Sequence, residues 1–459
     1  MKLTPRISAP LDADFQPLAW FNRQYVADVK ESGRGVPLVL GLEREAGRLA
    51  CHETMVRPEA DAETLRYVER LVKFLLWARG GWRIYVGGPP ALGESIRRTY
   101  SPSGARAFDV ELMTRVYEQP LEVVVTTAEA VPTTREVTLK LGGHLDGYRL
   151  GFDLGASDYK VAAVQEGRVV YSAEFAWQPT KAADPEYHYR HLAEGLKQAA
   201  AHLPHVDAIG GSTAGVIVDN EFRVASLLRS VPPEQFDRAK TIFHRLRAEW
   251  QVPLEVANDG DVTALAGGMS VPAKGLLGVA MGSSQAAGYL NPTGAMTGWL
   301  NELAFAPVDN NPGAAADEWS GDRGVGVQYF SQQAVNRLLT SAGIVLPAEL
   351  DLPGRLVAVQ ELMAKGDERA ARIYETIGVY FGYAVAQYAE FYEFDRLLVL
   401  GRVTTGHGGE VILTGARAVL RTEFPELADR AGLQLPDEQS KRVGQAVAAA
   451  SLPPLRPAR

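Results

Sequence analysis

The spacing of apolar and polar residues predicts a mixed α/β chain that begins with a small domain of its own. Extended runs at Val36–Leu42 and Leu49–Val56 flank a polar turn, as in a β-hairpin. Glu63–Ala78 repeats apolar residues at helical intervals. A helix is expected from Ala91, and further strands at Trp82–Val86, Leu121–Thr126 and Arg135–Leu141. The glycine-rich stretch Gly142–Gly147 marks a domain boundary.

The remainder of the chain divides into two strand-rich units. From residue 147, the pattern predicts the order β-β-β-α-β-α-β, which is a mixed α/β unit rather than a simple βαβ series. A second unit starts near residue 266 and runs from a strand at Leu276–Met281, through a long helix at Asp367–Phe391, to a strand at Arg396–Leu400. We therefore predict domains at residues 1–146, 147–265 and 266–459, and leave open that the C-terminal helix returns to the second domain.

Composition and charge narrow the classes of function. The 459 residues are 46% hydrophobic and 22% charged, with a formal net charge of −8, which argues against a protein that binds the nucleic-acid backbone. Cys51 is the single cysteine, so an intrachain disulfide and a cysteine zinc cluster are excluded. We find neither a signal peptide nor a transmembrane segment. A cytoplasmic protein with no nucleic-acid or membrane partner is expected.

A first candidate site follows the strand Tyr148–Leu154. This strand carries Asp153 near its end, and the small-residue turn Gly155-Ala156-Ser157 comes next. Small residues let backbone N–H groups approach phosphate oxygens closely, and the Ser157 hydroxyl could bond a phosphate oxygen. Asp153 stands where it could hold Mg²⁺ through water. The alternative is an ordinary hairpin turn with an incidental aspartate.

Two later strands end in similar small residues. Met281 leads into Gly282-Ser283-Ser284, whose amides and hydroxyls could clamp a second phosphate. Leu400 leads into Gly401, with Gly406 beyond it, so the backbone leaves room for an adenosine group. Taken singly, each of these segments also fits an ordinary loop.

Asn258 and Asp259 stand at the end of another buried strand, just before a helix. Ligands of open α/β sheets bind outside the carboxyl ends of strands, and Asp259 could accept the proton of an attacking hydroxyl. The alternative is that one of the two residues merely caps the helix. The segment with Ser212 and Thr213, after the strand Val206–Gly210, gains meaning only from its place in this series.

The order of these segments resembles the superfamily of actin-like ATPases and sugar kinases, and within it the ROK family (repressors, open reading frames and kinases). The resemblance covers roughly Tyr148 to Leu420. Asn258-Asp259 falls where the family's E-N-D-A-N places its catalytic base, and Glu302 matches the glutamate of G-E-x-G-H. The remaining matches are Asp153, Gly155, Ala156, Ser157 and Lys160 to D-x-G-G-T-x-x-K, Val308-Asp309 to a closing V-D, and Gly321-Asp322-Arg323-Gly324 to the G-N-R-G of the zinc loop.

The resemblance implies a fold, cofactors and residue roles. The fold would be a two-lobed actin-like ATPase (ribonuclease H-like) core with an additional N-terminal α+β domain. Asp259 would be the general base, and Asp153 would place Mg²⁺, most simply through water. The substrate, a small sugar-like molecule, would meet Asn258, Glu302, Ser212 and Thr213. ATP would be held by Gly155, Ala156, Ser157, Lys160, Gly282, Ser283, Ser284, Gly401 and Gly406. A homodimer is left open.

Several residues depart from the family pattern. Phe305 stands where the family has a histidine that binds zinc and sugar, and Gly324–Gln328 lacks the family's cysteines, so no zinc is expected. The second phosphate turn continues as Gln285-Ala286-Ala287, with side chains that could narrow the space for phosphate. Residues 1–146 have no counterpart in an ordinary family kinase and do not match a helix-turn-helix. Whether they form a degenerate copy of an actin-like lobe is left open.

Three functions remain from the sequence. The first is ATP- and Mg²⁺-dependent phosphorylation of a hydroxyl on a sugar or sugar-like polyol. The second is a nucleotide or sugar sensor on the same fold with little or no turnover, which the altered second phosphate turn and Phe305 motivate. The third is a scaffold or regulator that works through the N-terminal domain.

Overall fold

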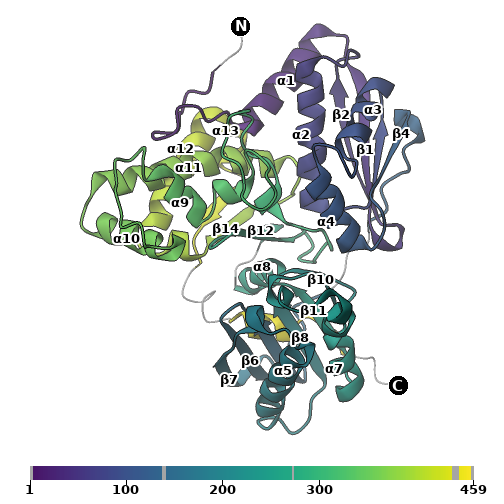
Figure 1. Ribbon diagram of the computed structural model, residues 1–459, viewed down its shortest axis with the longest axis vertical. Coiled ribbons are helices and arrows are strands. Elements are labelled where there is room, and N and C mark those ends of the chain that lie inside the picture. The colour runs from purple at the N-terminus through teal and green to yellow at the C-terminus, as the bar shows by residue number, and fades with distance from the viewer. Residues whose placement is uncertain (1–3, 137–140, 271–272, 437–443, 456–459) are drawn as a thin grey trace.

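The protein consists of three packed bodies. The computed structural model describes residues 4–136, 141–270, 273–436 and 444–455. Figure 1 shows the N-terminal domain beside a helix-rich body that we call lobe II, and a third body, lobe I, below them. Among the described helices, none combines the length and the apolar character that crossing a membrane requires.

The N-terminal domain is a four-stranded sheet with helices. Its strands lie in the order β2-β1-β3-β4, with β1 antiparallel to β2 and β3, and β3 parallel to β4. Its elements are α1 (Leu18–Ser32), β1 (Val36–Glu43), β2 (Leu49–Val56), α2 (Ala62–Arg79), β3 (Arg83–Gly87), α3 (Pro90–Thr99), α4 (Ala107–Tyr117) and β4 (Glu122–Thr126). The expected hairpin, helix and strands are thus present. Of the expected strand Arg135–Leu141, residues 137–140 lie outside the described residues, and Arg135 forms an isolated bridge with Leu49.

Lobe I is built around a five-stranded sheet in the order β11-β8-β5-β6-β7. β5 pairs antiparallel with β6 and parallel with β8, and β8 pairs parallel with β11. Its elements are β5 (Tyr148–Leu154), β6 (Asp158–Gln165), β7 (Arg168–Ala176), α5 (Pro185–Ala200), β8 (Ala208–Thr213), β9 (Val216–Val218), β10 (Glu221–Val224), α6 (Phe236–Lys240), α7 (Ile242–Trp250) and β11 (Leu254–Asn258). In the N-terminal sheet, by contrast, the first strand has antiparallel neighbours on both sides. The idea of a degenerate lobe copy therefore finds no match in the strand pairing.

Lobe II has a four-stranded sheet in the order β13-β12-β14-β15. Its elements are β12 (Leu276–Met281), β13 (Gln285–Leu290), α9 (Gln332–Leu338), α10 (Leu352–Ala364), α11 (Glu368–Ala389), β14 (Arg396–Leu400), α12 (Gly408–Glu423), α13 (Pro425–Ala428) and β15 (Gly432–Gln434). Helix α8 (Asp259–Ser270) joins the lobes. It runs past the predicted boundary at residue 265, and its first turn packs on β13, where a Cβ on Gly260 would lie 2.3 Å from the Ala287 carbonyl oxygen.

The N-terminal domain and lobe II share one apolar core, so neither is an independent body. Helix α2 lies between the N-terminal sheet and lobe II (Figure 1), and its Phe74 ring is 4.6 Å from the Phe391 ring just after α11. Helix α1 was not predicted, because Pro17 before it offers no side-chain cap and its apolar residues form no clear stripe. It forms because Tyr25 and Val29 are buried in the shared core. Tertiary packing here outweighs weak local signals.

The last described helix, α15 (Gln445–Ala450), returns to lobe I and packs on the sheet across β5 and β8. Two glycines make this approach possible. A Cβ on Gly151 would lie 1.7 Å from the Ala446 carbonyl oxygen, and a Cβ on Gly210 would lie equally close to the Ala449 carbonyl oxygen, at 1.7 Å. The helix backbone therefore rests directly on the sheet.

Candidate functional site between the lobes

Asp153 lies at the edge of lobe I where several parallel strands end. In register with it on β8 is Ser212, whose hydroxyl donates to Asp153 Oδ1 at 2.7 Å. Burial raises the pKa of the Asp153 carboxyl, while the Ser212 hydrogen bond and Lys160 oppose that rise. Ser212 and Thr213 are completely buried. In this conformation the Ser212 hydroxyl is engaged by Asp153, and the Thr213 hydroxyl donates to the Ala214 carbonyl at 3.3 Å.

Asn258 and Asp259 mark the junction of β11 and α8, as predicted. The Asn258 amide oxygen accepts from the Gly260 N–H at 2.7 Å, and its Nδ2 donates to the Gly215 carbonyl at 2.9 Å. Asn258 thus caps the helix, which is the alternative that the sequence left open. The carboxyl group of Asp259, the first residue of α8, makes no hydrogen bond to another side chain in the described part of the chain. It is therefore available to accept a proton.

Asp261 lies two residues after Asp259 on α8, and its side chain is held by groups of lobe II. Its Oδ1 accepts from Asn301 Nδ2 at 2.9 Å and from the Tyr289 N–H at 3.3 Å. The Asn301 amide oxygen in turn accepts from the Tyr392 hydroxyl at 3.2 Å. Neither Asp261 nor Asn301 was singled out from the sequence. The signal for Asp261 was its place two residues after Asp259 in the run Asn258-Asp259-Gly260-Asp261.

Glu302 is positioned by the N-terminal domain. The carbonyls at the end of a helix have no partner within the helix. At the end of α2, those of Trp77, Ala78 and Arg79 accept from the backbone N–H groups of Glu302, Asn301 and Leu300 at 3.0, 2.9 and 3.4 Å. Two residues before Leu300, the Gly298 carbonyl accepts from the buried Arg44 side chain at 2.6 Å. Residues 298–302, which we call the acceptor strap, are therefore fixed to the N-terminal domain.

Three carboxyl groups at this junction resist ionisation. Burial, with the charge of Asp153 nearby, raises the pKa of Asp259 to about 6. Burial raises the pKa of Asp261 to about 7 against two opposing hydrogen bonds. Burial and the charges of Asp259 and Asp261 raise the pKa of Glu302 to about 8. Acidic groups shifted toward neutral pH in this way suit proton transfer, and such shifts gather at functional sites.

Two exposed turns provide free backbone donors. The first, Gly155–Ser157, follows β5, and the second, Gly282–Ser284, follows β12. Within the described ranges, the backbone N–H groups of Ala156, Ser157, Ser283 and Ser284 have no hydrogen-bond partner. Free N–H groups on tight turns bind anionic oxygens. Lys160, the remaining predicted phosphate contact, is 44% exposed and lies 3.4 Å from Asp158.

The Gln285 side chain, which follows the second turn, does not crowd it. Gln285 is 2% exposed, and its Nε2 donates to the Tyr388 hydroxyl in the core at 3.1 Å. Its amide oxygen lies close to Gly326, where an added Cβ would be 2.2 Å away. The glutamine therefore points into lobe II, and the concern that it narrows the phosphate space is removed.

Small residues surround a cavity beside Gly401. It measures about 480 Å³ and is lined by Thr263, Ala266, Gly267, Leu400, Thr404 and Gly406, among others. Gly401 has a φ of 99°, and a Cβ there would lie 2.4 Å from the Met281 carbonyl oxygen, just before the second turn. The two predicted adenosine contacts thus border one cavity, and it adjoins the second phosphate turn.

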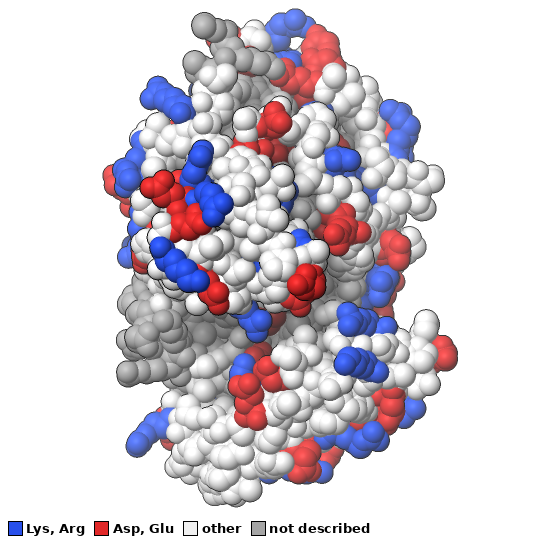
Figure 2. All heavy atoms as spheres, turned by 60° about the vertical axis from the view of Figure 1, so that its left-hand side comes forward, with Lys and Arg blue, Asp and Glu red and all other residues white. Residues whose placement is uncertain are grey.

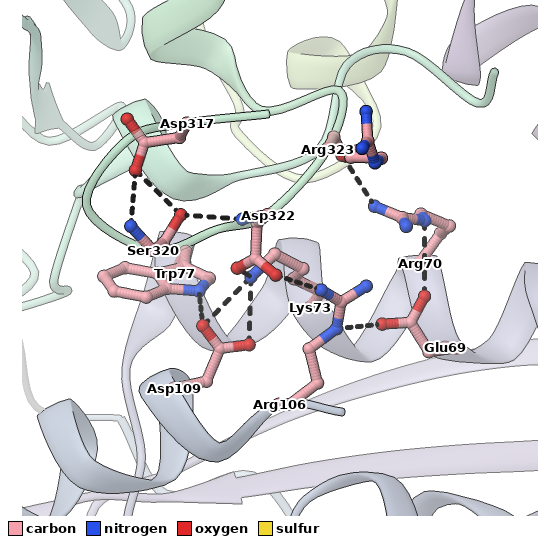
Figure 3. A network of polar contacts seen from close by, with 10 residues as sticks. All are labelled: Glu69, Arg70, Lys73, Trp77, Arg106, Asp109, Asp317, Ser320, Asp322 and Arg323. Carbon is pink, nitrogen blue, oxygen red and sulfur yellow. Dashed lines mark hydrogen bonds and ion pairs between the residues drawn. The ribbon is translucent and has the colours of Figure 1, made fainter. Parts of the chain in front are cut away.

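A buried network of charges holds the loop that follows Glu302. Figure 3 shows Lys73 of α2 between two carboxylates, with Nζ 2.9 Å from Asp109 Oδ2 and 2.5 Å from Asp322 Oδ2. Arg106 pairs with the second oxygen of Asp322 and, at 2.7 Å, with Glu69. The segment that matches the family's G-N-R-G is therefore anchored by charges of the N-terminal domain.

Phe305, in the histidine position of the family motif, belongs to an aromatic cluster. Its ring lies 4.5 Å from that of Trp77, 5.7 Å from Phe108 and 5.3 Å from Trp319. It is 8% exposed and brings no polar group to the site. Among the described side chains, no group of three or more His, Cys, Asp and Glu residues could hold a metal ion.

Comparison with known proteins shows which solved structures share this fold. No family model matches the chain, and no curated protein matches its sequence. Among solved structures, a ROK hexokinase from Thermus thermophilus has 18% identity and a TM-score of 0.52, with 66% of this chain and 97% of that chain covered. A ROK family protein from Streptococcus pneumoniae, in complex with sucrose, has 11% identity, a TM-score of 0.51 and coverages of 66% and 96%.

A ROK family transcriptional regulator, a homolog of the E. coli MLC protein, is also similar. It has 16% identity and a TM-score of 0.51, and covers 84% of this chain and 96% of its own. That share exceeds what residues 147–459 alone can supply, so the match reaches into the N-terminal domain. At these identities the likeness establishes the fold. The chain has the two-lobed, actin-like fold of the ROK proteins, as predicted, and this fold is shared by kinases and a regulator.

Proposed function

We propose that the protein transfers the γ-phosphoryl group of ATP to a hydroxyl of a sugar or sugar-like polyol. One observation carries the proposal: Asp259 begins α8 between the lobes with its pKa raised to about 6 and its carboxyl group free of side-chain partners in the described chain. A carboxylate of this kind can take the proton of an attacking hydroxyl near neutral pH, which contributes roughly 10²–10⁴-fold in rate.

The residues present fit the implied cofactors. Small residues around Gly401 leave about 480 Å³ for adenosine, and the free N–H groups of the two turns can hold phosphate oxygens. Asp153 would hold Mg²⁺ through water, since this ion commonly takes one or two carboxylates and phosphate oxygens. Bound ATP and Mg²⁺ would supply the phosphoryl group and neutralise its charge. Asp259 would accept the proton, and Asp261 and Glu302 would orient the acceptor's hydroxyls.

The test measures ATP consumption with purified protein, Mg²⁺ and a panel of sugars. At least one sugar should stimulate consumption, and Asp259→Asn should lower kcat by about 10²–10⁴-fold while the protein still melts cooperatively at or above the wild-type temperature, since the variant removes a buried carboxyl whose pKa is raised to about 6. Glu318→Gln, at an exposed position in the loop that follows Glu302, is the control and should keep full activity. Turnover that survives in Asp259→Asn would remove Asp259 from this role.

A second candidate is a sensor on the same fold. Phe305 favours it, because an apolar ring in the core stands where the kinases of the family place a ligand histidine. If ATP or a sugar raises the melting temperature while ATP consumption stays at background over the whole panel, the sensor function is supported and the kinase function fails.

A further inference from the structure

A second cavity, of about 460 Å³, lies where the N-terminal domain, lobe I and the acceptor strap meet. Its floor includes Asn258 and Asp261, next to the proposed base. One wall is the N-terminal domain, with the tip of the β1–β2 hairpin and Tyr117. The facing wall is lobe I, with the β9–β10 hairpin and Arg247 of α7, and the strap closes a third side with Trp299. The cavity is therefore continuous with the catalytic junction but reaches well beyond it.

Three of the carboxyl groups that line this cavity are held in donor–acceptor pairs. On the hairpin tip, Arg48 Nη1 donates to Glu45 Oε1 at 2.8 Å. On lobe I, Asn220 Nδ2 donates to Glu255 Oε2 at 3.0 Å. On the floor, Asp261 accepts from Asn301. Each pair sets a carboxylate beside an N–H group, and neighbouring hydroxyls of a sugar ring both donate and accept.

The cavity is lined by two arginines, Arg48 and Arg247, and by four carboxyl groups, those of Glu45, Asp219, Glu255 and Asp261, which disfavours an anionic ligand. The charge of Arg48 is paired with Glu45. Tyr117, Met296 and Trp299 add apolar and aromatic surface between the polar pairs. On the face of the molecule drawn in Figure 2, acidic and basic side chains are interspersed. A neutral, hydroxyl-rich ligand with apolar ring faces fits this lining.

The volume of this cavity indicates how large a ligand it accepts. The cavity is about as large as the one beside Gly401, at roughly 460 against 480 Å³. Adenosine, the group proposed for the latter, has many more atoms than a single hexose. Moreover, the Arg48–Glu45 pair comes from the N-terminal domain and Asp261 from the helix that joins the lobes, so the polar groups of the lining belong to different domains.

We infer that the phosphoryl acceptor is a carbohydrate of at least two linked units, a disaccharide or glycoside. The unit that is phosphorylated lies at Asp259 and Asp261, and the second unit lies against Arg48, Glu45 and Tyr117 of the N-terminal domain. This inference rests on the proposed function, since it assigns the chemical class of the acceptor. It also gives the N-terminal domain a role in recognition.

Calorimetric titration of the full-length protein tests this inference. The monosaccharides are glucose, mannose and N-acetylglucosamine, and the disaccharides are maltose, cellobiose, trehalose, mannobiose and chitobiose. At least one disaccharide should bind about 10-fold or more tightly than its own monosaccharide, as expected for added hydrogen bonds to charged groups. Arg48→Met should abolish most of that advantage and leave the monosaccharide affinity unchanged. Glu45→Gln is a second variant at the same tip and should act in the same direction.

The control is Arg97→Met, which breaks the exposed Arg97–Glu94 pair. This pair belongs to the same domain as Arg48–Glu45 and has the same i,i+3 spacing, but it does not line the cavity. It should leave every affinity unchanged. Equal affinity for disaccharides and monosaccharides, equal losses for both in Arg48→Met, or no saccharide binding at all would each overturn the inference. If a monosaccharide is phosphorylated without any disaccharide preference, the inference falls and the kinase function stands. If a disaccharide binds without ATP consumption, the kinase function falls and the assignment of the ligand class stands.

Discussion

The backbone N–H of Glu302 donates to the carbonyl oxygen of Trp77 at 3.0 Å, which joins lobe II to the last turn of α2. The two neighbouring N–H groups of the strap cap the next carbonyls of the same helix. The end of α2 therefore has its free carbonyls satisfied by the segment that carries a proposed substrate contact. The N-terminal domain, which has no assigned role from the sequence, is part of the support of the site.

Removal of residues 1–146 should therefore prevent folding of the remainder. The deletion exposes the apolar face of α11 that packs on Phe74 and leaves the strap without partners. We expect a fragment of residues 147–459 that aggregates in size-exclusion chromatography and melts without a cooperative transition. Co-expression of residues 1–146 as a separate chain is the control and should recover soluble protein. A monomeric fragment with a sharp transition, or one that keeps function, would contradict this dependence.

Glu302→Gln should stabilise the protein as the pH rises. The pKa of Glu302 is raised from 4.5 to about 8 in the folded protein, so the group is protonated in both states below pH 4.5. Between pH 4.5 and 8, Glu302 loses its proton in the unfolded chain but keeps it in the folded protein. The free energy of unfolding therefore falls as the pH rises through this window. The variant avoids the loss, so its melting temperature should exceed that of the wild type by about 2–4 °C or more at pH 8, and by nothing at pH 4.5.

The measurement is a series of melts from pH 4.5 to 8.5 with wild type and variant side by side. Glu318→Gln, which changes an exposed carboxyl group, serves as control and should follow the wild type throughout. A gap between Glu302→Gln and wild type that stays constant with pH would show that Glu302 ionises normally.

Lys73→Met should destabilise the protein strongly. Lys73 is completely buried, and its loss leaves Asp109, also completely buried, without its cation. Breaking a buried pair by removing one partner costs about 3–5 kcal/mol. Urea unfolding monitored by tryptophan fluorescence measures this, since Trp77 donates to Asp109 at 2.9 Å. Arg97→Met, in an exposed pair, should cost about 1 kcal/mol or less. Similar losses in the two variants would mean that the network contributes little.

Gly401→Ala should weaken nucleotide binding by about 10-fold or more. The φ of 99° disfavours any side chain there, and the new Cβ would lie 2.4 Å from the Met281 carbonyl oxygen, so the strand end beside the second phosphate turn must shift. The rise in melting temperature with ATP and Mg²⁺ measures the effect. Gly366→Ala is the matched control, because Gly366 has a φ of 81° with no atom within 4 Å of an added Cβ. An unchanged ATP response in Gly401→Ala would remove this cavity from nucleotide binding.

Much of the core fold was predictable because its signals are local. Strands that end in small-residue turns, as at Asp153 and Met281, are visible in the sequence, and the structure confirms both. The support of the site was not predictable, because it depends on pairings across distant segments. Lys73 with Asp322, or Trp77 with Glu302, leave no local signal. Ser212 was expected at the substrate, but a position in a strand cannot reveal that its hydroxyl turns toward Asp153.

The placement of α15 has a consequence for how the chain is made. Lobe I leaves the ribosome before lobe II, yet the face of its sheet at Gly151 and Gly210 is covered by a helix synthesised after the whole of lobe II. Until that helix emerges, nascent lobe I has an apolar surface open to solvent. Completion of the lobe I fold is therefore coupled to the synthesis of α15, and until then the growing chain is a natural client for a chaperone.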